Sequence, residues 1–337
     1  MYYVGIDLHK QSITVCVVDE SRKEVRIQKF CCSDTELIVA FFRKLGQFKA
    51  VVEATSSYEW LWQLLEPHAE ELVLAHPGKL RVIAESTRKS DRLDARVLAD
   101  FLARDMIPRA YRPTPRQREH RALVRQRRFI QKEITVLKNK MRHVLGNYNA
   151  DRSDLFEEDG QKYLKKLRLR PSDRFVVNQL LSSWRHHEEQ LQAMDETLKA
   201  FAKKASAQEK EARAVLRSIP GVGPVTVDVV VSEIGDVRRF RSAKQVAAYA
   251  GLAPGQRESA GKRKGLSIDK KGSPLLRWAL VEAAWRLVRL SRYWCGVFEG
   301  LKQRSGKKKA IVAIARRLLG VMVALLRSGQ CYRSAAA

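Results

Sequence analysis

The sequence contains no apolar run that approaches the length of a transmembrane helix, which argues against a membrane-spanning protein. The five cysteines lack the spacing of metal ligands, and the adjacent Cys31 and Cys32 are not expected to bridge each other. The opening residues, MYYVGIDLHK, carry no signal-peptide pattern. We therefore expect reduced thiols and a cytoplasmic protein.

Acidic residues are scarce after the first hundred positions. Residues 1–100 hold 14 lysines and arginines against 15 aspartates and glutamates, whereas the remaining chain holds 50 against 22. The basic residues that give the chain its formal net charge of +27 are therefore in excess only after the first domain. Such a field attracts polyanions: nucleic acid is the favoured partner, and a membrane surface is the weaker alternative.

Strand and helix patterns alternate within residues 1–108, which we assign to one domain. Strand patterns rich in β-branched and aromatic residues occur at YYVGID, ITVCVV, EVRIQKF, KAVVEA and ELVLAHP. The first three are expected to form an antiparallel meander, and helical patterns separate and follow the others. The order β-β-β-α-β-α-β-α predicts an α/β domain with a mixed sheet.

Long helical patterns fill residues 109–210. Apolar residues recur every seven positions from Leu123 to Val144 and again from Trp184 to Leu198. Two such heptad-bearing helices predict a coiled coil.

Residues 211–337 predict an all-α domain. The segment IPGVGPV between two helical patterns indicates a helix-hairpin-helix, in which glycines let backbone N–H groups approach a phosphate; a plain glycine turn is the alternative. Residues 253–273, APGQRESAGKRKGLSIDKKGS, break the helical periodicity, so we expect a basic, glycine-bearing loop there. A loop of that length inside a compact domain is usually functional.

The excess of basic over acidic residues is largest from Arg104 to Arg142, a segment with 13 basic and 3 acidic residues. A merely solvated helix face usually mixes both signs, so nucleic-acid contact is favoured over an ordinary basic surface. We predict nucleic-acid contacts at Lys10, Arg125, Arg128, Gly221, Gly223, Arg257, Lys262, Arg263 and Lys264.

Four acids are candidate metal ligands. Asp7 and Glu53 each follow the apolar run of a strand, where a buried carboxylate is costly unless something compensates it. Asp91 and Asp94 lie three apart at the start of a helix, hence on one face; a capping box is the alternative reading of this pair. Brought together, the four could hold two Mg²⁺ ions. His9 could support a ligand, contact a phosphate or lie in a turn.

These motifs together resemble a known family. YVGIDLHK with Asp7, VVEATSSYEW with Glu53 and RKSDRLDARVLADF with Asp91 and Asp94 are similar to the DEDD tetrad of the RuvC-like (RNase H-like) domain of DEDD insertion-sequence transposases, the bridge-RNA-guided recombinases. LRSIPGVGPVTVDVVVSEIGDVRRFRSAKQVAAYAGLAPGQRESAG is similar to the C-terminal transposase domain of that family. The resemblance runs from residue 3 to about residue 328 in the same domain order.

The resemblance implies a mechanism that composition does not show. The tetrad would bind Mg²⁺, and Ser259 in APGQRES would attack DNA to form a covalent phosphoserine link. One protomer's tetrad would meet another protomer's serine, within a homotetramer built from two homodimers. A structured bridge RNA would pair with target and donor double-stranded DNA, and the protein would be a bacterial, nucleoid-associated enzyme.

Two rival hypotheses stay open from the residues. A RuvC-like metal-dependent nuclease or junction resolvase would use water as the nucleophile and leave Ser259 incidental. A non-enzymatic scaffold for RNA or DNA would carry a decayed nuclease domain. A serine hydroxyl is a weak nucleophile, and no histidine lies nearby in sequence, so the favoured hypothesis needs a metal to activate Ser259.

Overall fold

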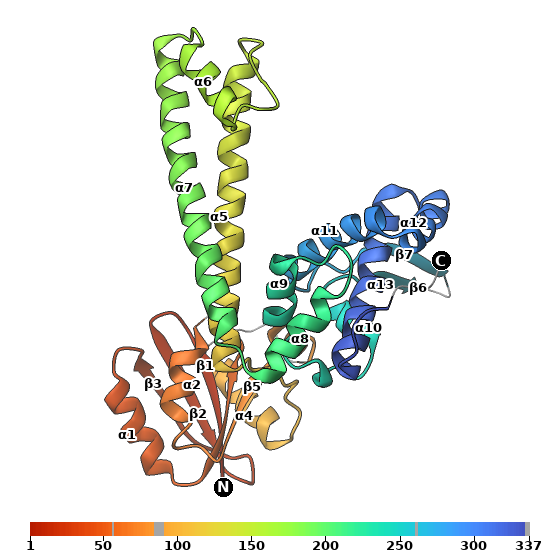
Figure 1. The fold of residues 1–337 in the computed structure, drawn as a ribbon. Helices are drawn as coiled ribbons and strands as arrows, with labels where there is room; N and C mark the ends of the chain where they lie inside the picture. Colours follow the sequence, from red (N-terminus) through yellow and green to blue (C-terminus); the bar gives the residue numbers. More distant parts are fainter. Residues whose placement is uncertain (56, 84–90, 260–261, 334–337) are drawn as a thin grey trace. The chain divides into compact units, whose positions relative to one another are not determined.

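The computed structural model describes residues 1–55, 57–83, 91–259 and 262–333, without the side chains of 81–83, 256–259 and 262–266. Its contacts divide the chain into Met1–Arg112 and Pro113–Ala337, which are described in turn (Figure 1). The further boundary predicted at residue 210 stays a prediction.

A five-stranded mixed sheet forms the centre of the first unit (the red and orange strands of Figure 1). Its strands are β1 (Tyr2–Leu8), β2 (Ser12–Val18), β3 (Glu24–Cys31), β4 (Phe48–Glu53) and β5 (Glu71–Ala75), in the order β3-β2-β1-β4-β5. The first three strands pair antiparallel, and β4 and β5 continue the sheet in parallel to β1. The predicted meander and mixed sheet are therefore confirmed.

Helices cover both faces of this sheet. The helices of the first unit are α1 (Thr35–Leu45), α2 (Tyr58–Leu65), α3 (Pro77–Ile83) and α4 (Asp91–Ala103). Aromatic and aliphatic side chains of α1 and α2 pack with Val4 and Ile6 on one face. On the other face, α4 packs its small and apolar residues against Cys16 and Val51. The short helix α3 was not predicted from the sequence.

Two long helices begin the second unit. They are α5 (Pro115–Gly146) and α7 (Pro171–Lys203), with the short α6 (Glu158–Lys166) between them. Each begins with proline in its first turn, a position where the missing N–H costs nothing. Ion pairs join Arg127 to Asp195 and Lys138 to Glu188, so the helices run antiparallel. The heptad residues from Ile130 to Val144 and from Leu180 to Met194 that are apolar share one cluster between the helices, while a supercoil stays a prediction.

The rest of the second unit is a helical bundle with one hairpin. Its elements are α8 (Ala207–Arg217), α9 (Pro224–Ile234), the 3-10 turn η1 (Val237–Arg239), α10 (Ala243–Tyr249), β6 (Pro254–Ser259), β7 (Lys262–Ile268), α11 (Pro274–Leu290), α12 (Arg292–Ser305) and α13 (Lys307–Ser328). No helix in the described part of the chain is long and apolar enough to cross a membrane. The five cysteines are free thiols.

The all-α prediction for this region is wrong at residues 253–273. The expected loop contains two antiparallel strands, with Ser259 paired to Lys262 and Glu258 to Arg263. Apart from Leu266 and Ile268 the two strands are mainly polar, so neither an apolar strand pattern nor a helical period marks the segment. Antiparallel strands pair through backbone hydrogen bonds, which do not require apolar side chains.

A buried ionic network ties α5 to α8 and α9. The Asp228 carboxylate contacts His120 Nε2 at 3.0 Å and Arg213 Nη1 at 2.7 Å, and all three residues are less than a tenth exposed. Arg213 also pairs with Glu209, which binds Arg116 in turn. Burial alone would raise the pKa of Asp228, but the hydrogen bonds from His120 and Arg213 outweigh it and lower the pKa.

We expect Asp228→Ala to lower the free energy of unfolding by about 3–5 kcal/mol at neutral pH, because it leaves Arg213 buried without this partner. The lowered pKa means that this stabilisation is present above the ordinary aspartate value, 3.8, and is lost as the pH falls through the lower folded value. Urea titrations of both proteins across pH 3–7 measure the difference. Glu299→Ala, which breaks the half-exposed pair with Lys302, is the control and should cost less than about 1 kcal/mol. An equal loss in both variants would contradict the buried network.

Candidate active site

Two of the predicted acids end neighbouring strands. Asp7 lies near the end of β1 and Glu53 is the last residue of β4. The strands are parallel, and Ile6 pairs with Val52. Asp7 and Glu53 are the next residues in each strand, so they lie beside each other at one edge of the sheet. Both belong to the face that α4 covers, because side chains alternate along a strand and their odd-numbered neighbours pack there.

Gly5 lets α4 lie directly on β1. A Cβ at this position would stand 2.0 Å from the carbonyl oxygen of Ala95 and 2.5 Å from the amide nitrogen of Ala99. Both atoms belong to the helix backbone, so no side-chain rotation could relieve the overlap. This close approach brings the N-terminal turn of α4, which carries Asp91 and Asp94, to the edge where Asp7 lies.

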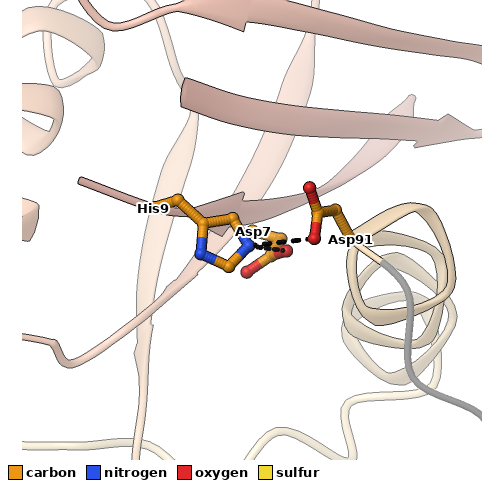
Figure 2. A group of neighbouring side chains, drawn as sticks. All are labelled: Asp7, His9 and Asp91. Atoms are coloured by element: carbon orange, nitrogen blue, oxygen red, sulfur yellow. Dashed lines mark hydrogen bonds and ion pairs between the residues drawn. The ribbon is translucent and has the colours of Figure 1, made fainter. Parts of the chain in front are cut away.

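Asp7, His9 and Asp91 form the closest group of potential metal ligands in the described residues, with ligand atoms within 4.8 Å of one another. Figure 2 shows the imidazole of His9 between the two carboxylates, with both contacts meeting at one nitrogen. His9 Nε2 lies 3.0 Å from Asp7 Oδ2 and 3.1 Å from Asp91 Oδ1. On the far side of Asp91, Lys29 Nζ lies 2.9 Å from Oδ2.

The pKa values of the two aspartates are shifted in opposite directions. Burial raises the pKa of Asp7; His9 counteracts this, and the negative charges of Asp94 and Asp91 add to the rise. The hydrogen bond from Lys29 lowers the pKa of Asp91, assisted by His9. An acidic edge with a destabilised carboxylate of this kind favours the binding of a cation.

The residues fit a divalent metal ion. The single Nε2 of His9 contacts both carboxylates: it forms a hydrogen bond with Asp91, whereas its 3.0 Å contact with the buried Asp7 Oδ2 is an ion pair without a well-directed hydrogen bond. Thr14, the cross-strand neighbour of Asp7, is also buried, and its hydroxyl has no hydrogen-bond partner among the described residues. Carboxylate oxygens are the ligands that hard divalent cations prefer, and a cation at Asp7 would compensate its charge.

The complete tetrad stays a prediction. Asp94 is exposed one turn after Asp91, and its charge acts on Asp7. Glu53 is half-buried at the sheet edge, outside the closest group. The alternative of a helix cap stays open, because the residue before Asp91 lies outside the described part of the structure; the two oxygens of Asp91 bond to His9 and Lys29. Lys29 was missed by the sequence analysis, because nothing in its sequence neighbourhood indicates that β3 carries it to this edge.

The predicted nucleic-acid residues have varied surroundings. Lys10 is exposed directly after the cluster. Arg125 binds the buried Glu233 through two hydrogen bonds, and the Arg128 guanidinium lies 3.7 Å over the ring of Trp278. Both arginines therefore have protein partners, and their contact with a phosphate stays a prediction.

The two predicted turn glycines differ in what requires them. Gly221 has a φ of +79° and packs against the backbone of α11. These two constraints require glycine at this position whether or not a phosphate binds there. Gly223 precedes α9 and has no such constraint.

Ser259 ends β6, and its side chain lies outside the described part of the structure. The same holds for the side chains of Arg257, Lys262, Arg263 and Lys264, although their backbones lie in the hairpin. Their predicted roles are therefore not tested by the geometry.

Comparison with known proteins agrees with this architecture. Residues 4–150 match the model of the IS110-type DEDD transposases, described as "Transposase", and residues 213–298 match the "Transposase IS116/IS110/IS902 family". The chain is 28% identical to the transposase for insertion sequence element IS1111A of Coxiella burnetii, over 99% of this chain and 92% of that protein. It is 25% identical to a probable family 20 transposase of Pseudomonas aeruginosa, over 98% of each. A pilin gene-inverting protein of Moraxella bovis is 24% identical, over 97% and 96%.

The α/β sheet with acids at its edge and the two family matches define the chain as a DNA transposase, an enzyme and not a binding scaffold. It belongs to the IS110/IS116 family of insertion-sequence transposases, whose two models together span well over half of its length. Transposases of the DEDD type are typically metal-dependent.

We expect Gly5→Ala to lower the free energy of unfolding by about 2 kcal/mol or more, because α4 must move off the sheet to admit the methyl group. Gly78→Ala is the matched control in the same unit: its nearest neighbour would be His76 Cε1 at 3.4 Å, and we expect a change below about 0.5 kcal/mol. Urea unfolding followed by circular dichroism compares the two. A Gly5→Ala protein as stable as the control would refute the close approach of α4.

Proposed function

We propose that this transposase is an RNA-guided DNA recombinase that cuts and rejoins donor and target DNA through a covalent phosphoserine intermediate at Ser259. In this proposal Asp7, Glu53, Asp91 and Asp94 hold Mg²⁺. The observation that carries it is the grouping of Asp7 and Asp91 around His9 at the sheet edge, with ligand atoms within 4.8 Å of one another, because two carboxylates this close suit a cation.

A bound divalent cation would stabilise the negative charge that develops on a phosphodiester during displacement. The Ser259 hydroxyl would give up its proton and form an oxygen–phosphorus bond, while the phosphorus–oxygen bond to deoxyribose breaks and the leaving oxygen takes up a proton. Attack by the freed DNA hydroxyl would reverse the step, so the strands could be rejoined without an external energy source. Arg257, Lys262, Arg263 and Lys264, on the same hairpin, offer positive charge for the flanking phosphates.

Full-length relatives support recombination over simple cleavage. The Moraxella bovis relative is named for inverting a gene, and turning a DNA segment around requires every cut end to be rejoined. A covalent serine link preserves the bond energy needed for that rejoining, whereas hydrolysis by water discards it. The water-dependent nuclease or junction resolvase is thus the less favoured alternative.

The proposed partners are a structured guide RNA and two double-stranded DNAs, held by a homotetramer of two dimers. The support is the charge of the chain: 50 basic residues against 22 acidic ones follow residue 100. A structured non-coding stretch in the DNA flanking the reading frame would supply the RNA, and its transcript is the natural probe for binding.

We expect the wild-type protein, given Mg²⁺, guide RNA and donor DNA, to form a protein–DNA adduct that survives denaturation. Ser259→Ala should abolish the adduct, since it removes the attacking oxygen. Ser267→Ala, in the partner strand of the same hairpin, is the matched control and should retain it. Denaturing gel electrophoresis of labelled DNA detects the product. DNA cleavage that continues in Ser259→Ala would favour water as the nucleophile.

If one protomer's acids act with another's serine, mixing Asp94→Ala and Ser259→Ala proteins should restore activity that neither has alone. Some of the assembled sites would then contain both an intact tetrad and an intact serine. Recombination by co-refolded mixtures, compared with each variant alone, measures the recovery. Complete inactivity at every mixing ratio would count against delivery of the serine between protomers.

A further inference from the structure

Lys29 belongs to a row of side chains that crosses three strands. Thr14 of β2 pairs with Asp7 of β1 on one side and with Lys29 of β3 on the other. Directly paired residues of antiparallel strands point to the same face, so all three face α4. The register of the sheet therefore aims Lys29 at the acidic edge, although 21 positions separate it from Asp7.

The ammonium group of Lys29 reaches Asp91 and not its strand neighbour. Lys29 Nζ lies 2.9 Å from Asp91 Oδ2, while the Thr14 hydroxyl between the strands has no partner among the described residues. His9 already bonds to the other oxygen of Asp91. Both oxygens of this carboxylate are thus occupied by donors of the chain itself.

A cation that binds through Asp91 has to compete with these donors. The Lys29 side chain is 59% exposed and Asp91 40%, so the pair is solvated and its loss is inexpensive. The pair holds Asp91 in the structure, and because it is solvated a cation can displace it.

We propose that Lys29 is a positioning residue of the active site: it holds Asp91 in place while the metal site is empty and yields that carboxylate to the divalent ion. The inference rests on the metal site of the proposed function and adds a competitor to it. Removing Lys29 should strengthen metal binding, the opposite of what removing a ligand does.

The test is a titration of the full-length protein with Mn²⁺, followed by electron paramagnetic resonance of the free ion at low ionic strength. Lys29→Met should bind Mn²⁺ about two- to fivefold more tightly than wild type, in keeping with an exposed ion pair. Lys29→Arg keeps the cation and should resemble wild type. Lys49→Met, which removes a lysine from Glu71 in the same sheet, is the matched control and should leave the affinity unchanged.

Two further variants separate this inference from the proposed metal site. Asp91→Asn should weaken Mn²⁺ binding, and adding Lys29→Met to Asp91→Asn should have no further effect if the lysine acts through that carboxylate. Equal or weaker binding by Lys29→Met, with Asp91→Asn impaired, would overturn the role of Lys29 alone. Unchanged binding in Asp91→Asn would instead remove Asp91 from the metal site and the inference with it.

Discussion

The first unit depends on the contact of α4 with the backbone of β1 at Gly5. This contact places Asp91, the first residue of the helix, against Asp7 near the end of a central strand. Burial raises the pKa of Asp7, and the negative charges of Asp94 and Asp91 nearby raise it further. His9 and Lys29 offset part of that cost from the neighbouring turn and strand. The fold thus groups carboxylates where we propose a cation site, and His9 and Lys29 contact these carboxylates in the structure.

The second unit shows that a basic sequence is not uniformly a basic surface. Arg213 is buried against Asp228, and Arg125 neutralises the carboxylate of Glu233, which is only 2% exposed. These arginines join α5 to the helical bundle and stabilise the fold. The charge excess after residue 100 remains large, but part of it is neutralised within the fold by such ion pairs. Arginine counts alone therefore overstate a binding surface.

Local sequence patterns predicted the strands and helices that are rich in apolar residues or have one apolar face. The β-branched runs of β1 and β2 and the amphipathic α11 follow from residue spacing. The hairpin of β6 and β7 escaped prediction because most of its residues are polar, and α3 because its seven residues are too few for a helical period to be recognised. At the site, Asp7 was predicted because an acid directly after an apolar strand is unusual, and Asp91 because it lies three residues before Asp94 at the start of a helix. Lys29 could not be found, because its position depends on a register that only the folded sheet defines.

We propose that Asp7 and Asp91 form a divalent-cation site at the edge of the sheet. Anomalous diffraction from crystals soaked in Mn²⁺ can test this site, because the ion's position is located independently of the protein atoms. We expect an anomalous peak beside the carboxylate oxygens of Asp7 and Asp91, with Lys29 moved away from Asp91. A peak elsewhere, or an unchanged Lys29–Asp91 pair with no peak at this edge, would contradict it.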